Sequence, residues 1–185
     1  MDLVRRGESK DCEFKASLRW SIKGNLVDEA VTDSALKTIA AFLNAEGGTL
    51  LLGVGDEGEI VGIEVDGFPN TDKFLLHLLN VVEAALGKSA AAKIDARVLR
   101  LRDRTVCAVH CQPSRTPVWA RLLKMAPKGQ ERFFVRSGGA STMELEPSKV
   151  SDYQRHRGSG SRSKRLEALW QPVAKKSDPA PGAPA

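Results

Sequence analysis

The 185-residue sequence lacks several features that would place it in a specialised class of protein. No stretch reaches the run of about 18 consecutive apolar residues that a membrane-spanning helix requires. The N-terminus, residues 1–6, mixes an acid with basic residues where a secretion signal needs an unbroken apolar core. These absences predict a cytoplasmic protein that makes no membrane contact.

Cysteine is scarce, and its number and spacing argue against disulfide bonds and a zinc site. There are three cysteines, an odd number, and Cys107 and Cys111 fall in a segment that alternates like a strand. A disulfide framework is therefore not expected, and reduced thiols are predicted. No two cysteines are separated by two residues, and the three histidines are scattered along the chain, so a zinc site is not expected either.

Nucleophile and nucleotide motifs are also missing. No Gly-x-Ser-x-Gly elbow falls at a predicted strand end, and no glycine-rich loop ends in Gly-Lys-Ser or Gly-Lys-Thr. Residues 53–58 do match the dinucleotide pattern of three glycines, but that pattern has meaning only between a strand and a helix. Here a second strand is predicted to follow, so no nucleotide cofactor is expected.

Charge, in contrast, is abundant and segregated. Residues 25–72 hold ten acids against the single base Lys37, whereas residues 97–136 hold ten bases against Asp103 and Glu131. Such segregation indicates a surface that attracts polyanions at one place and holds carboxylates at another. The alternative is that each run is simply a solvated face.

Apolar periodicity predicts one ordered domain over residues 1–156 and a disordered tail over 157–185, which is basic and then rich in alanine and proline. Within the tail, Leu166, Leu169 and Trp170 could instead form one amphipathic turn for a protein or nucleic-acid partner. The domain alternates helical and strand-like segments, as an α/β (α+β) fold does. The predicted helices are 27–44, 71–86 and 147–156; the predicted strands are 12–18, 49–54 paired with 59–63, 94–101 paired with 105–112, 118–119 and 132–136, with a loop at 137–142.

Three carboxylates could carry chemistry. Glu8 precedes the first strand, Glu13 lies within it, and Asp56 follows the strand 49–54. If those strands are neighbours, the three acids could converge into a set of hard oxygen ligands that suits Mg²⁺ or Mn²⁺. Such an ion could orient a phosphodiester and stabilise its leaving oxygen. The alternative for Asp56 is an ordinary turn residue before Gly58.

These residues carry a resemblance to a known family. Glu8 with the Glu13-Phe14-Lys15 segment, the stretch 41–48, and the stretch 52–62 resemble the Schlafen AlbA_2 domain. Later in the chain, Pro117-Val118 and residues 134–142 resemble the closing strand and the arginine- and glycine-containing segment of that family. The similarity extends from about Gly7 to Arg155.

The resemblance implies a mixed, mostly antiparallel sheet with two main helices and a short C-terminal helix. It also implies a DNA- or RNA-binding domain; the family has carried an ATP-binding description as well, which is the weakest alternative. Similar domains in animal Schlafens cleave transfer and ribosomal RNA. Their essential acids correspond here to Glu8, Glu13 and Asp56 as catalytic and metal-binding residues.

The sequence also departs from the family. Many bacterial members read Gly-Val-Asp-Asp where this chain has Gly53-Val54-Gly55-Asp56, so one accessory acid is missing. The animal zinc site has no counterpart. The animal core pairs two such lobes, whereas this chain has one, so a homodimer would restore that geometry.

Two functions follow as hypotheses. The first is a nucleic-acid-binding domain that acts as a divalent-metal-dependent endoribonuclease on structured RNA such as tRNA, with Lys15 neutralising the scissile phosphate. The alternative is a non-catalytic DNA-binding or transcription-regulator module. In either case Trp20 and Trp119 could stack an unpaired base, with core packing as their alternative use. The residues predicted to contact the phosphate backbone are Arg97, Arg115, Arg121, Lys124, Lys128 and Arg136.

Overall fold

A computed structural model describes residues 2–101, 103–124, 129–137 and 141–157. It contains a four-stranded sheet, a three-stranded sheet and a small hairpin. The strands of the larger sheet follow the order β1-β4-β6-β5, and those of the smaller sheet follow the order β7-β8-β9. All strand pairs are antiparallel except β1 with β4. The α/β fold class and the mostly antiparallel sheet are therefore confirmed.

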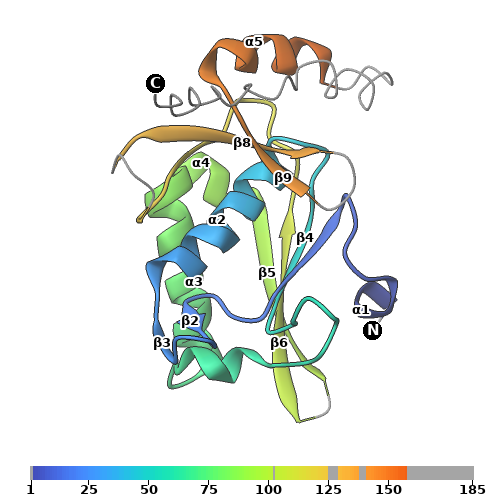
Figure 1. Ribbon diagram of the computed structural model, residues 1–185, viewed down its shortest axis with the longest axis vertical. Helices are drawn as coiled ribbons and strands as arrows, with labels where there is room; N and C mark the ends of the chain where they lie inside the picture. The colour runs from blue at the N-terminus through green and yellow to red at the C-terminus, as the bar shows by residue number, and fades with distance from the viewer. Residues whose placement is uncertain (1, 102, 125–128, 138–140, 158–185) are drawn as a thin grey trace, which may run out of the picture.

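The larger sheet is covered by helices on one face. Its strands are β1 (Cys12–Lys15), β4 (Gly48–Leu52), β5 (Ile94–Leu101) and β6 (Arg104–Cys111). Helices α2 (Glu29–Leu43), α3 (Thr71–Leu86) and the short α4 (Lys88–Ala91) lie along one side, and α1 (Asp2–Arg6) lies on the other (Figure 1). The main core lies between the sheet and α2 and α3, because their apolar stripes face it.

The smaller sheet lies across one end of this layer, with the C-terminal helix against it (Figure 1). It consists of β7 (Trp119–Arg121), β8 (Glu131–Ser137) and β9 (Ser141–Leu145), and the helix is α5 (Pro147–His156). One face of β8 joins the main core through Phe134, and the other packs Phe133 and Val135 against Tyr153 of α5. The alternation of β8 thus fills two separate apolar clusters.

Helix α3 begins and ends where the sequence predicts. The Asn70 side chain accepts a hydrogen bond from the backbone N–H of Lys73, and Gly87 ends the helix with a positive φ of 86°. Helix α2 is likewise capped by Asp28, whose carboxylate accepts from the N–H of Ala30. These caps satisfy backbone groups that have no partner within a helix.

The predicted hairpin of 49–54 with 59–63 is wrong. Strand β4 pairs instead with β1 in parallel and with β6 in antiparallel register. After β4 the chain turns sharply at Gly53, whose carbonyl accepts the N–H groups of Val61 and Gly62, and only the isolated bridge between Val54 and Ile60 remains. Residues Ile63–Asp66 then form a 3₁₀ helix. The apolar run 59–63 covers the sheet without becoming part of it.

Other differences concern short elements. The loop predicted at 137–142 contains the start of β9. The segment that follows the predicted strand 12–18 holds the hairpin of β2 (Trp20–Ser21) and β3 (Leu26–Val27). Helices α1 and α4 were not predicted. These elements have two to five residues each, which is too short for periodicity to emerge. Of the predicted tail 157–185, only Arg157 is described, and its guanidinium donates to backbone carbonyls of the ordered domain instead of being disordered. No described helix is long and apolar enough to cross a membrane.

Candidate functional site

The parallel strands β1 and β4 end at the same edge of the larger sheet. They are joined by α2, and their last residues, Lys15 and Leu52, are register partners. Immediately beyond, the backbone N–H groups of Gly53 and Val54 both donate to the carbonyl of Lys15, at 2.8 and 3.3 Å. Carboxyl ends of neighbouring parallel strands commonly flank ligand sites in α/β proteins. Two of the candidate acids, Glu8 and Glu13, lie at β1, and the third, Asp56, follows β4.

Glu8 and Glu13 lie close together at β1. The Glu8 carboxylate accepts a hydrogen bond of 2.9 Å from the backbone N–H of Phe14, the residue that follows Glu13. The pKa of the Cys12 thiol is raised to about 11, first by burial and then by the nearby charges of Asp11, Glu8 and Glu13. Both predicted acids therefore contribute negative potential to the same few atoms of β1.

Glu13 is buried, with 9% of its surface exposed, and both of its carboxylate oxygens are paired. Oε1 lies 2.8 Å from the Lys15 ammonium, and Oε2 lies 2.9 Å from Nη1 of Arg136. The Lys15 ammonium also donates to the carbonyl of Phe14. Lys15 thus neutralises a carboxylate of its own strand.

Arg136 was predicted to contact phosphate, and its placement contradicts that prediction. The residue is 6% exposed. Besides Glu13, its guanidinium donates to the carbonyl of Ser9 and to the hydroxyl of Thr142, and it lies over the ring of Phe42 at 4.8 Å. Arg136 has the same parity along β8 as Phe134, so it points toward the core and joins the two sheets.

Asp56 lies in the turn that follows β4, at the same end of the sheet. The turn is closed by hydrogen bonds from the N–H of Gly55 to the carbonyl of Glu59 and from the N–H of Gly58 to the carbonyl of Gly55. The Asp56 side chain is exposed. Across the described ranges, no group of three or more His, Cys, Asp or Glu residues is arranged to hold a metal ion. The present arrangement of these acids does not fit a bound Mg²⁺ or Mn²⁺.

The other predicted basic residues that the structure describes lie at the surface, on separate elements. Arg97 on β5 pairs with Asp95 at 2.6 Å, and Arg121 on β7 pairs with Glu131 at 2.6 Å. Arg115 is exposed in the loop before β7, and Lys128 lies outside the described residues.

Lys124 joins the segment after β7 to the start of α2. Its ammonium lies 2.8 Å from the Asp28 carboxylate. The hydrogen bond to Lys124 lowers the pKa of Asp28, and the same bond raises the pKa of Lys124. These opposite directions are those of a formed ion pair.

Three buried polar residues escaped the sequence analysis. Asn44 bonds to the backbone of Val118 in both directions and donates to the carbonyl of Phe134. The Asp33 carboxylate accepts the N–H groups of residues 123 and 124. Asp66 accepts the N–H groups of residues 18–20, and burial raises its pKa against the lowering effect of those bonds. The only sequence signal is a polar residue beside an apolar stripe, which does not identify the partner.

Comparison with known proteins identifies relatives of this architecture. The family model described as Schlafen, AlbA_2 matches residues 8–144. The DIP2311 protein from Corynebacterium diphtheriae has a similar fold, with a TM-score of 0.56 and 19% sequence identity. That similarity covers 80% of this chain but only 27% of the DIP2311 chain, so this chain spans about a quarter of it.

A second solved structure is the N-terminal domain of an ATP-dependent DNA helicase RecG-related protein from Nitrosomonas europaea. It matches with a TM-score of 0.45 and 22% identity, over 78% of this chain and 92% of that one. The search of curated proteins found no match. The matched range includes Glu8, β1, α2, β4, Asp56 and the strand of Arg136. The chain therefore belongs to the Schlafen AlbA_2 family.

Proposed function

We propose that this domain binds nucleic acid. The observation that carries the proposal is how the structure distributes the segregated charge. Asp33 and Asp66, from the acid-rich stretch, are buried as acceptors of backbone N–H groups, whereas Arg97, Arg115 and Arg121 of the basic stretch remain exposed. Three acids, Glu13, Asp33 and Asp66, and one base, Arg136, are buried among the described residues, so the surface that they form is more basic than their sequence. Such a surface attracts polyanions. Membership of the AlbA_2 family supports the same function.

Salt dependence tests this proposal. We expect labelled tRNA and single-stranded DNA to bind with an affinity that falls steeply as salt increases, because each phosphate contact releases counterions. Arg115→Glu should weaken binding severalfold. Lys73→Glu, an equal charge reversal at an exposed position of the first turn of α3, is the matched control and should have little effect. Equal effects of the two reversals would exclude a localised nucleic-acid surface.

A divalent-metal-dependent endoribonuclease is the second candidate. It is supported by the closeness of Glu8 to Glu13 and by the position of Asp56 beyond the parallel partner strand. Metal binding by Glu13 would require it to exchange Lys15 or Arg136 for the ion. The ion pairs observed at Glu13 favour the alternative, a module that binds without cleavage.

Cleavage separates these two candidates. The domain is incubated with tRNA and with single-stranded DNA, in Mn²⁺ or in chelator, and product length is measured. Asp56→Asn is the sharpest variant, since the side chain is exposed and its change should leave the fold intact. Glu13→Gln is preferable to Glu13→Ala because it retains an acceptor for Arg136. Metal-dependent products lost in both variants would establish the enzyme, whereas intact but bound RNA would establish the module.

A further inference from the structure

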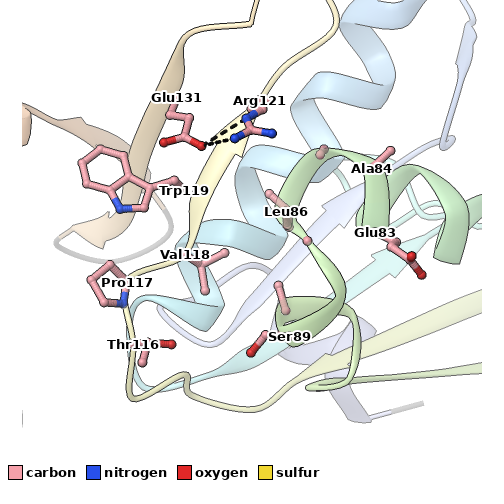
Figure 2. Close-up of a pocket in the computed structure, with 13 residues that line it drawn as sticks. Glu83, Ala84, Leu86, Ser89, Thr116, Pro117, Val118, Trp119, Arg121 and Glu131 are labelled. Carbon is pink, nitrogen blue, oxygen red and sulfur yellow. Dashed lines mark hydrogen bonds and ion pairs between the residues drawn. The ribbon is translucent and has the colours of Figure 1, made fainter.

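A pocket of about 320 Å³ lies between strand β7 and the junction of α3 with α4. Figure 2 shows Pro117, Trp119 and Glu131 on the strand side and Glu83, Leu86 and Ser89 on the helix side. Its volume is at the lower end of the range for pockets that bind small molecules, about 300 to 1,000 Å³. It is separate from the acids of β1, since none of them lines it.

The strand side presents a fixed aromatic ring. Trp119 is half-buried, and its indole packs against the ring of Phe133 with a centroid distance of 5.3 Å. The pocket is completed by apolar groups that include Leu86 and Val118. An aromatic ring held by its neighbours stacks a planar ligand without losing much side-chain freedom. This part of the pocket suits a flat, mostly apolar ring.

The polar groups of the pocket suit the edge of such a ring. Arg121 donates to Glu131 through Nε at 3.0 Å and Nη2 at 2.6 Å, and both bonds end on Oε1. Oε2 of Glu131 takes no part in that pair and has lone pairs for a further donor. The hydroxyl of Ser89 on the opposite wall can donate or accept. A carboxylate oxygen of this kind pairs with an exocyclic amino group of a nucleobase.

The charged residues in and around the pocket limit which flat ligands it can bind. Glu83 and Glu131 line the pocket and oppose a phosphate inside it. At its margins Lys88 directly precedes the lining residue Ser89 and lies 3.7 Å from the Glu83 carboxylate, and Arg115 directly precedes Thr116. Both cations are exposed and oppose a cationic ligand. A neutral ring inside the pocket, with phosphate groups on either side of it, is compatible with both the acids inside and the cations at the margins.

From this geometry we infer that the pocket binds one unpaired nucleobase with an amino group, from a single-stranded segment of RNA or DNA. Trp119 stacks the base, Glu131 accepts from its amino group, and Lys88 and Arg115 attract the flanking phosphates. This inference rests on the proposed nucleic-acid binding and specifies the form that is bound.

Binding is measured by fluorescence anisotropy with labelled oligo(dA), oligo(dC) and oligo(dT), their RNA equivalents, and a duplex of the same length. We expect Trp119→Leu to weaken single-strand binding about ten-fold, the size of the loss typical of one stacked base, and to leave duplex binding unchanged. Trp119→Phe retains an aromatic face and should bind nearly as wild type. Adenine and cytosine oligomers should bind more tightly than thymine or uracil oligomers.

A second measurement does not depend on the stability of Trp119→Leu. Trp20→Phe combined with Trp170→Phe leaves Trp119 as the only indole, and oligo(dA) should quench its emission over the concentrations at which anisotropy rises. Unquenched emission despite binding, or equal single-strand affinities of wild type and Trp119→Leu, would overturn the inference while the proposed function stands. Failure of the wild type to bind any oligomer, duplex or tRNA would instead overturn the proposed function itself.

Discussion

At the scale of the residue, Asn44 connects three backbone segments. It follows the last residue of α2 and is fully buried. Its amide donates to the carbonyls of Val118 and Phe134, at 2.8 and 3.0 Å, and accepts from the N–H of Val118 at 2.8 Å. Its own carbonyl accepts from the Tyr153 hydroxyl. A single side chain thus aligns α2 with β7 and β8.

We expect Asn44→Ala to lower the free energy of unfolding by about 3 kcal/mol, because it leaves three buried backbone groups without partners. Urea unfolding measures the change. Asn80→Ala removes the same side chain from an exposed position of α3 and is the control, with an expected change below about 0.5 kcal/mol. Similar values for the two variants would show that the hydrogen bonds of Asn44 contribute little.

The three buried thiols make stability depend on alkaline pH. Burial raises the pKa of Cys107 and of Cys111 from 9.0 to about 12, and that of Cys12 to about 11. The unfolded chain therefore releases these protons at lower pH than the folded chain, so stability falls as pH rises above 9.0 toward those values. The slope approaches about 1.4 kcal/mol per pH unit for each thiol.

Urea unfolding between pH 8 and pH 10 tests this prediction. Cys107→Ala should show a shallower loss than wild type across that interval, although it is less stable at pH 8. In addition, iodoacetamide should leave all three thiols of the native protein unmodified at pH 8, because the thiolate is the nucleophile. Rapid native alkylation would contradict the burial of these side chains.

At the scale of the element, long periodic segments could be predicted and strand partners could not. Helix α3 has the predicted bounds because Asn70 and Gly87 signal both ends. The hairpin at 49–63 was mispredicted because a short apolar run after a glycine turn fits a strand as well as a segment packed on a sheet. Glu8 and Glu13 could be selected as candidate residues from a family pattern. The pairing of Glu13 with Arg136, 123 residues away, could not be predicted.

Gly53 is the residue that turns the chain away from that hairpin. Its φ is +88°, and a Cβ atom would lie 2.9 Å from the backbone nitrogen of Ile63. We expect Gly53→Ala to cost about 3 kcal/mol, from the left-handed conformation and the clash together. Gly67→Ala is the control: its φ is +68° but nothing lies within 4 Å, so about 1 kcal/mol is expected. Thermal unfolding of both variants gives the comparison, and equal costs would rule out the close backbone contact.

At the scale of the whole molecule, the pair of Glu13 and Arg136 fastens the smaller sheet to the larger one. The Arg136 side chain is 4% exposed and that of Glu13 is 12% exposed, so solvent screens their attraction weakly. The same guanidinium reaches the carbonyl of Ser9 and the hydroxyl of Thr142. Strands β1, β8 and β9 therefore meet at one side chain.

We expect Arg136→Met to destabilise the domain by about 3 kcal/mol, because it leaves Oε2 of the buried Glu13 carboxylate without its partner, while Lys15 still pairs with Oε1. Adding Glu13→Leu should recover part of that loss, since an apolar pair replaces a buried charge. Hydrogen exchange should show faster exchange in β9 and α5 of the single variant. Arg121→Ala, which breaks an exposed ion pair, should cost less than about 1 kcal/mol. A double variant no more stable than Arg136→Met would refute the unpaired-carboxylate explanation.

The contacts of Arg157 affect when the domain can fold during its synthesis. Its guanidinium donates to the carbonyls of Leu43, Ala45 and Ser114, which emerge from the ribosome 43 or more residues earlier. The backbone carbonyls at the C-terminal end of α2 therefore lack their hydrogen bonds from Arg157 until nearly the whole domain has been translated. A nascent chain paused before α5 should remain protease-sensitive at residues 43–45, and the ordered domain should close only after Arg157 has left the exit tunnel.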